Sequence, residues 1–252
     1  MAFPVIWSPA LKQFTLPTEE IHVWRASLNL DAAVMQRLKS NLCEDEISRA
    51  DRFHFDCDRD HFIAARGILR ELLSLYLNES PAAIRLIYGP QGKPALLEND
   101  EARLHFNLSH SHGLSVLAFA HAREVGIDLE PIRRTFAGDD IAERYFSAAE
   151  LVELRALPSW LKTDGFFLCW TRKEAYIKAR GEGLHVPLDS FTVSLTPGQP
   201  EKLQSSDELR WKLQAFEPAE KFAGALVGEG QDWRARFWEW NPFLSPNARA
   251  GK

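Results

Sequence analysis

The sequence of 252 residues contains only three cysteines, Cys43, Cys57 and Cys169, and no CxxC pair. This pattern argues against a disulfide framework and a zinc ribbon, so we expect a reducing, cytoplasmic location. The N-terminus has no basic segment, and Pro4 and Pro9 interrupt its apolar residues, so we expect no signal peptide. No apolar run approaches the ~20 residues of a membrane span, so we expect no membrane role.

An excess of positive charge is also missing. The chain has 30 Lys and Arg against 35 Asp and Glu, a formal net charge of −5. A whole-chain role in nucleic-acid binding therefore lacks its usual electrostatic basis. The sequence also lacks a GxxxxGK[ST] loop, a GxGxxG turn after a strand, a GxSxG elbow and an HExxH helix, which excludes several familiar classes of site.

The composition that remains is that of a globular protein, with 45% hydrophobic residues, 8 Trp and 16 Phe to bury. Apolar spacing predicts helices over residues 58–77 and 163–180. Strands are predicted over 105–111, over 114–120, which is apolar on both faces, and over 124–132, where apolar and polar residues alternate. Residues 31–50 look helical, whereas the Gly and Pro residues within 88–94 argue against a regular element there. A short echo, RFHF at 52–55 and RYF at 144–146, suits two similar α/β halves with a boundary near Arg123, at 1–122 and 123–252.

Asp128 and Glu130 are the first candidates for chemistry, since residues two apart on a strand share one face. Two carboxylates in that arrangement suit a divalent cation such as Mg²⁺. The alternative is a solvated face of a half-exposed strand, which produces the same alternation.

The segment WTRKEAYIKARGEGL, residues 170–184, predicts a helix with Glu174 and Lys178 along the border of its buried stripe. A half-buried carboxylate and ammonium are suited to act as a metal ligand, base or acid. The alternative is an ordinary surface pair four residues apart. Residues 170–180 also carry a net charge of +3, a patch that could face phosphates or an acidic partner.

Two further segments are ambiguous on their own. NLSHS, residues 107–111, ends a predicted strand and could bind a phosphate, form a zinc pair from His110 and His112, or be a hydrogen-bonded turn. GKP, residues 92–94, could bring backbone N–H groups and the Lys93 ammonium to a phosphate, or simply form a loop.

The order GKP, NLSHS, GIDLE and WTRKEAYIKARGEGL along the chain resembles the Sfp-type 4′-phosphopantetheinyl transferases, from about Glu44 to about Leu195. The resemblance implies an α+β fold of two similar halves related by a pseudo-twofold axis, with the active site in the cleft between them. It implies transfer of phosphopantetheine from coenzyme A to a serine of an acyl or peptidyl carrier protein, with release of 3′,5′-ADP. One chain supplies both halves, so we expect a monomer.

The same resemblance implies roles for individual residues. Asp128, Glu130 and Glu174 would hold Mg²⁺, or Mn²⁺, against the pyrophosphate of coenzyme A, the co-substrate. Glu174 would also act as general base, Lys178 would stabilise or protonate the leaving phosphate, and Lys173 would assist nearby. Asp128, Glu174 and Lys178 are thus the predicted catalytic residues. The residues predicted to bind coenzyme A are Arg49, Arg66, Gly92, Lys93, Pro94, Asn107, Ser109, His110, Lys173 and Lys178.

One departure from the family pattern is visible. Glu46 stands three residues before Arg49, where some members carry a basic residue for the 3′-phosphate. The alternatives to a transferase are a non-catalytic coenzyme A or carrier-protein binding module of the same fold, and a zinc hydrolase built on His110 and His112.

Overall fold

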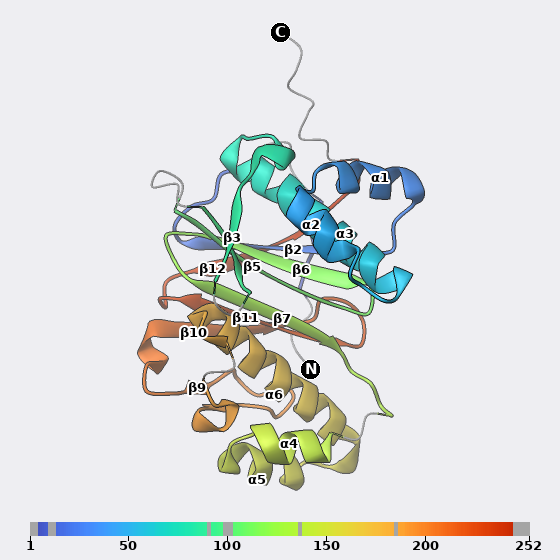
Figure 1. The fold of residues 1–252 in the computed structure, drawn as a ribbon. Helices are drawn as coiled ribbons and strands as arrows, with labels where there is room; N and C mark the ends of the chain where they lie inside the picture. Colours follow the sequence, from blue (N-terminus) through green and yellow to red (C-terminus); the bar gives the residue numbers. More distant parts are fainter. Residues whose placement is uncertain are drawn as a thin grey trace.

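The computed structural model describes residues 5–9, 14–89, 92–97, 103–135, 138–183 and 186–243. Each half follows the same order: a strand, two short helices, a long helix, a two-stranded hairpin and two more strands (Figure 1). The first half comprises β2 (Glu20–Ser27), α1 (Ala32–Ser40), α2 (Glu44–Ala50), α3 (Asp56–Leu77), β3 (Leu86–Tyr88), β4 (Pro94–Leu96), β5 (Leu104–Ser111) and β6 (Leu114–His121). The second comprises β7 (Val125–Pro131), α4 (Asp139–Tyr145), α5 (Ala148–Ala156), α6 (Ser159–Arg180), β8 (Thr192–Val193), β9 (Leu203–Gln204), β10 (Trp211–Phe216) and β11 (Phe222–Glu229).

The sheet topology repeats as well. The order β2-β6-β5 in the first sheet corresponds to β7-β11-β10 in the second, and all of these neighbouring pairs are antiparallel. The long helices α3 and α6 each span 22 residues and end at a left-handed residue, Asn78 and Gly181. The predicted fold class of two similar α/β halves is therefore confirmed.

The end of the chain returns to the first half. Strand β12 (Arg234–Glu239) pairs in parallel with β2, and β1 (Ser8–Pro9) pairs in parallel with β12. The first sheet thus has the order β1-β12-β2-β6-β5. A division at 122/123 stays a prediction, and residues 234–239 lie in the sheet of the first half.

The layers run helices, sheet, sheet, helices (Figure 1). The central β2 and β6 are buried on both faces, which explains the nearly continuous apolar sequence of β6, whereas β2 also buries the polar Glu20 and His22. On β2, Val23 packs between the two sheets, whereas Trp24 packs beneath α1 and α3. A third core lies between the second sheet and α6. Within the described residues, no helix is both long and apolar enough to cross a membrane.

Most of the predicted elements are confirmed, with two differences. Residues 31–50 form two helices, α1 and α2, rather than one helical region. Tyr88 and Pro94 belong to the short paired strands β3 and β4, so the prediction of no regular element over 88–94 was partly wrong. Pro90 and Gln91 lie outside the described residues.

Gly126 sets the distance between β7 and α6. A Cβ at this position would overlap the carbonyl oxygen of Ala175 and the amide nitrogen of Ala179, both on α6. The helix backbone therefore packs directly on the strand, as only glycine permits. This close packing brings the side chains of α6 to the face of β7 that carries Asp128 and Glu130.

Candidate active site

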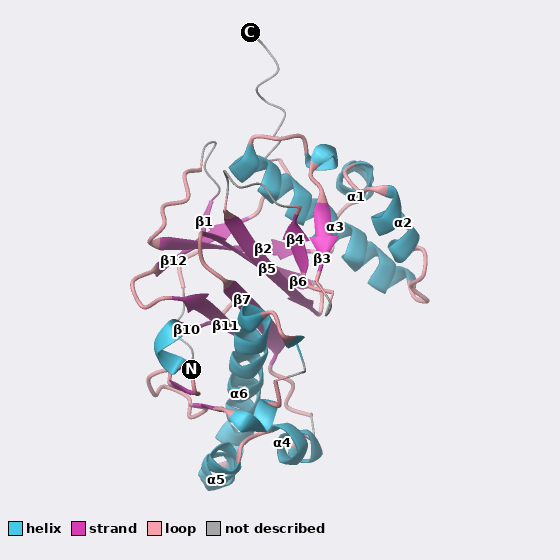
Figure 2. Ribbon diagram, turned by 60° about the vertical axis from the view of Figure 1, so that its left-hand side comes forward, coloured by secondary structure: helices cyan, strands magenta, loops and turns pink. Residues whose placement is uncertain are grey.

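Strands β5 and β7 belong to different sheets and lie side by side (Figure 2). Hydrogen bonds that involve side chains join them. The Asn107 amide oxygen accepts a hydrogen bond from the Ile127 backbone N–H at 2.9 Å. Ser109 Oγ donates to Asp128 Oδ1 at 2.7 Å, and Ser111 Oγ donates to Glu130 Oε2 at 2.9 Å. The alternate residues of NLSHS thus face β7. We call this contact the seam, formed by Asn107, Ser109, Ser111, Ile127, Asp128 and Glu130.

Helix α6 adds a cation and a third carboxylate to the seam. Lys178 Nζ lies 2.6 Å from Asp128 Oδ1 and 3.0 Å from Ser109 Oγ. Asp128 is 4% exposed, and its second oxygen, Oδ2, is buried with no hydrogen-bond partner. Burial, together with the negative charges of Asp128 and Glu130, raises the pKa of Glu174 to about 7. The strand pair and the helix pair predicted from the sequence are therefore brought together.

The donor chemistry of Asp128, Glu130 and Glu174 fits a hard divalent cation. Their oxygens are the ligands that Mg²⁺ prefers, the mutual repulsion on Glu174 calls for positive charge, and Asp128 Oδ2 has a free lone pair. Across the part of the chain that the structure describes, no group of three or more His, Cys, Asp or Glu side chains converges as a metal site. In the arrangement described, Lys178 neutralises Asp128 and Ser111 holds Glu130.

A second cationic cluster lies beside the seam, around Arg66 of α3. Arg66 is 6% exposed, yet its Nε and Nη1 are buried without hydrogen-bond partners. Burial lowers the pKa of Arg66, and the nearby charge of Arg49 lowers it further. His110 is exposed, but neighbouring atoms partly desolvate its ring, which lowers its pKa, as do the charges of Lys178 and Arg66. Arg66 and Arg49 each lie over the ring of Phe62, at 5.7 and 5.4 Å from the centroid.

Glu46, the departure from the family pattern, is 2% exposed and carries a structural role. Its Oε2 lies 2.7 Å from Arg70 Nε, its Oε1 lies 3.5 Å from Arg66 Nε, and its carboxylate also caps the N-terminus of α2. The basic residue that some family members carry is absent at this position, and the Glu46 carboxylate partly neutralises the positive charge of Arg66.

The expectation for Lys173 was wrong. Its side chain is fully buried, with Nζ 2.8 Å from Glu150 Oε2 and bonded to the carbonyl oxygens of Leu188 and Phe191. Glu150 also forms a capping box with Ser147 at the start of α5. Lys173 therefore points into the core of the second half, and not toward Asp128 and Glu130 on β7.

The prediction of a basic patch over residues 170–180 is also wrong, because these residues do not form a positively charged surface. Arg172 is 3% exposed and bonds Ser194, and Arg180 pairs with Glu182 at 2.7 Å. With Lys173 buried and Lys178 paired to Asp128, the formal charge of +3 does not form a face for an acidic partner. Periodicity placed the charges on a helix, but only the tertiary partners decide which of them reach solvent.

Lys93 lies close to the second half, but its ammonium does not reach into open space. Nζ contacts the carbonyl oxygens of Lys178 at 2.8 Å and Val125 at 3.3 Å, and Glu124 Oε2 at 3.3 Å. The neighbouring Gly92 has φ 75°, a left-handed value that suits the turn into β4. The loop is therefore fastened to β7 and α6 through its lysine.

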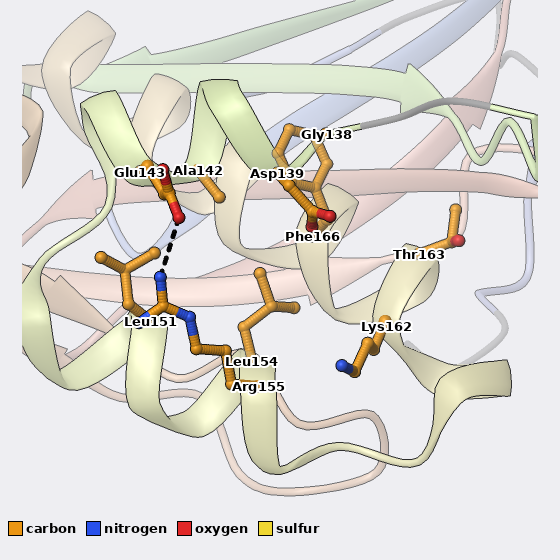
Figure 3. A pocket seen from close by; sticks show the side chains of 10 residues that line it. All are labelled: Gly138, Asp139, Ala142, Glu143, Leu151, Leu154, Arg155, Lys162, Thr163 and Phe166. Carbon is orange, nitrogen blue, oxygen red and sulfur yellow. Dashed lines mark hydrogen bonds and ion pairs between the residues drawn. The ribbon is translucent and has the colours of Figure 1, made fainter.

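Two pockets lie elsewhere. One of about 240 Å³ lies between α4, α5 and α6, with Leu154 and Phe166 at its wall and the Glu143–Arg155 ion pair at its rim (Figure 3). Phe166 precedes Glu174 by eight residues, about 12 Å along the helix, so this pocket is separate from the seam. The other, of about 450 Å³, lies beside β12. That the seam opens into a cleft stays a prediction.

Three residues that shape the site were not predicted individually from the sequence. Ser111 holds Glu130, Gly126 allows α6 to approach, and Tyr88 lies with its ring 5.7 Å from the Arg66 guanidinium. Ser111 follows the spacing of Asn107 and Ser109, and that period of two could have identified it. The approach of Tyr88 depends on the β3–β4 hairpin, for which the sequence offered no pattern.

Comparisons with known proteins agree on one family. Residues 24–122 match the model for the N-terminal part of 4′-phosphopantetheinyl transferase, and residues 124–235 match that of the 4′-phosphopantetheinyl transferase superfamily. The chain is 39% identical over 235 residues to 4′-phosphopantetheinyl transferase HetI of Nostoc sp., covering 93% of this chain and 98% of that protein. It is 32% identical over 160 residues to 4′-phosphopantetheinyl transferase Sfp of Bacillus subtilis, covering 64% of this chain and 69% of that protein.

Among solved structures, a holo-(acyl-carrier-protein) synthase from Bacillus anthracis in complex with CoA matches 43% of this chain and 96% of its own, with 26% identity and a TM-score of 0.37. The two family models and the relative that spans nearly the whole chain decide the assignment. The chain belongs to the 4′-phosphopantetheinyl transferase superfamily, and the Sfp-type resemblance of its motifs is confirmed.

Proposed function

We propose that the seam, together with Glu174 and Lys178, is where this transferase moves 4′-phosphopantetheine from coenzyme A to a serine hydroxyl of an apo acyl or peptidyl carrier protein. The observation that carries the proposal is the contact of Lys178 on α6 with Asp128 on β7 at 2.6 Å, beside Glu174, whose pKa is raised by burial and by the charges of Asp128 and Glu130. A module that only bound coenzyme A would not need this concentration of carboxylates beside an ammonium.

The reaction is a phosphoryl transfer, which depends on positioning and charge stabilisation. The serine oxygen forms a bond to the phosphorus that carries the pantetheine arm, and the bond from that phosphorus to the bridging pyrophosphate oxygen breaks. The serine proton passes to Glu174, directly or through a water. The Lys178 ammonium stabilises the negative charge that develops on the phosphate of the departing 3′,5′-ADP.

Mg²⁺, with Mn²⁺ as a substitute, is the cation that we assign to Asp128, Glu130 and Glu174. A divalent cation bound there would supply charge neutralisation at the pyrophosphate. Ser111 holds the Glu130 carboxylate through its 2.9 Å hydrogen bond, and Ser109 holds Asp128. These two hydroxyls therefore orient two of the three carboxylates before any ligand arrives.

The nucleotide end of coenzyme A would lie toward Arg66. Two of its guanidinium nitrogens, Nε and Nη1, make no hydrogen bond and could donate to a phosphate, although Nε also lies 3.5 Å from the Glu46 carboxylate. Arg49 adds to the same positive field, and His110 lies close enough to Arg66 for their charges to interact. We assign the 3′-phosphate to this cluster, and the nucleotide to the backbone of the loop at Gly92 and Pro94. Asn107 acts indirectly, because its side chain fastens β5 to β7.

Incubation of the purified protein with an apo carrier protein, coenzyme A and Mg²⁺ tests the proposal by intact-mass spectrometry. We expect the carrier to gain the mass of one phosphopantetheine, and to gain none when EDTA replaces Mg²⁺. No mass gain with any of a panel of fatty-acid, polyketide, nonribosomal-peptide and aminoadipate carriers, despite calorimetric binding of coenzyme A, would favour the binding module instead.

We also propose that the enzyme acts as a monomer in the cytoplasm. The support is that β5 of the first half and β7 and α6 of the second, all from one chain, build the whole seam. Sedimentation of the active protein at working concentration checks the first point, and cell fractionation checks the second.

A further inference from the structure

Lys93 connects the loop before β4 to the other half of the protein. Its ammonium has three acceptors: the carbonyl oxygens of Lys178 and Val125, and the carboxylate of Glu124. An ammonium group has three N–H donors. All three are therefore engaged in contacts within the protein, and none is left for a phosphate.

Each acceptor belongs to a part of the site. Lys178 is in the last turn of α6, where carbonyl groups lack helical partners and a cation is favourable, so Lys93 acts as a cap from outside the helix. Val125 is the first residue of β7. The capped carbonyl belongs to the same residue whose ammonium contacts Asp128.

Glu124 extends the connection to β5. Its Oε1 lies 3.1 Å from His105 Nδ1 while its Oε2 lies 3.3 Å from Lys93 Nζ. His105 is on β5, the strand that supplies Asn107 and Ser109 to the seam. The ion pair is partly open to solvent, since the Lys93 side chain is 22% exposed and the Glu124 side chain 37%.

We propose that Lys93 is a positioning residue that clamps the nucleotide loop to β7 and to the last turn of α6, and so fixes Lys178 against Asp128. This inference rests on the function proposed for the seam. Lys93 then contributes to transfer without touching coenzyme A through its ammonium, and the loop meets the nucleotide through its backbone.

The test compares ligand-free proteins first, because a clamp acts before coenzyme A binds and a phosphate ligand does not. Amide hydrogen exchange is measured for residues 177–183 in the wild type, Lys93→Met, Glu124→Gln and the control Lys162→Met, an exposed lysine of α6 distant from the seam. We expect exchange to be about tenfold faster in Lys93→Met, intermediate in Glu124→Gln and unchanged in Lys162→Met, and Lys93→Arg to restore part of the protection. Unchanged exchange in Lys93→Met would overturn the clamp.

Steady-state transfer gives the second readout. We expect Lys93→Met to lower kcat about tenfold with less than a threefold change in the KM for coenzyme A, because the positioned Lys178 is lost rather than a ligand contact. A large rise in KM with unchanged kcat would instead make Lys93 a direct phosphate ligand and refute the clamp. If the wild type shows no transfer at all, the proposed function fails while the exchange measurement still decides the clamp.

Discussion

The Lys178 ammonium on α6 lies 2.6 Å from the Asp128 carboxylate on β7, and the Ser109 hydroxyl on β5 contacts both. Three elements from the two halves therefore meet at one point. The contact depends on how closely α6 approaches β7 and on how firmly β5 is held beside β7. Each of these conditions can be changed by a single substitution.

Ser109→Ala removes the hydroxyl that bridges Asp128 and Lys178. Hydrogen bonds to charged groups contribute about 1.5–3 kcal/mol, so we expect kcat/KM to fall about 10- to 100-fold. Ser48→Ala, at an exposed serine of α2, is the control and should retain wild-type kinetics. Transfer by Ser109→Ala at the wild-type rate would show that the bridge has no role in the reaction.

Gly126→Ala places a methyl group against the backbone of α6 at Ala175 and Ala179. Overpacking of this kind costs about 1–3 kcal/mol, and the helix must move away from β7. We expect a lower midpoint in urea unfolding and loss of most transfer activity in the folded protein. Gly89→Ala, whose Cβ would meet only the Lys93 carbonyl oxygen at 3.7 Å, should leave the midpoint unchanged. A stable, fully active Gly126→Ala protein would contradict the close packing.

Lys173→Met tests whether this lysine is structural. The substitution leaves Glu150 fully buried without its cation, and breaking a buried ion pair typically costs about 3–5 kcal/mol. We expect a large loss in the free energy of unfolding, partly recovered in the double variant Lys173→Met/Glu150→Leu. A Lys173→Met protein with wild-type stability and no transfer activity would show that Lys173 acts in the active site rather than in the core.

The stability of the clamp depends on pH through Glu124. The hydrogen bond with His105 and the charge of Lys93 lower the pKa of Glu124 to about 2. Because the pKa is lowered on folding, the stabilisation is complete above the unfolded value near 4.5 and is lost as pH falls toward 2. The difference in unfolding free energy between wild type and Glu124→Gln should therefore shrink from pH 5 to pH 2. A difference that stayed constant over this range would show that Glu124 does not make these contacts in solution.

The sequence predicted the features that follow from the local periodicity of side chains and from the order of the motifs along the chain. Alternation in GIDLE placed Asp128 and Glu130 on one face of a strand, and helical spacing placed Glu174 beside Lys178. The order of the motifs identified the family and so predicted that strand and helix converge. The capping box at the start of α5 is likewise a local feature, because it involves only the four residues from Ser147 to Glu150.

The sequence could not show which charges meet partners from distant segments. Lys173 and Lys178 both look like basic residues of one helix, yet one is buried against Glu150, 23 residues earlier, and the other against Asp128, 50 residues earlier. The return of β12 to the first sheet is a parallel pairing across more than 200 residues. Such pairings follow from packing of the whole chain rather than from any local pattern.

In the proposed mechanism, the carboxylates and the lysine at the seam perform the transfer. The most direct measurement is the mass of an apo carrier protein after incubation with coenzyme A, Mg²⁺ and either wild type or Glu174→Gln, each shown by circular dichroism to be folded. We predict one phosphopantetheine added by the wild type and none by Glu174→Gln. Equal modification by the two proteins would contradict this mechanism, because the roles of proton acceptor and cation ligand assigned to Glu174 would then be dispensable.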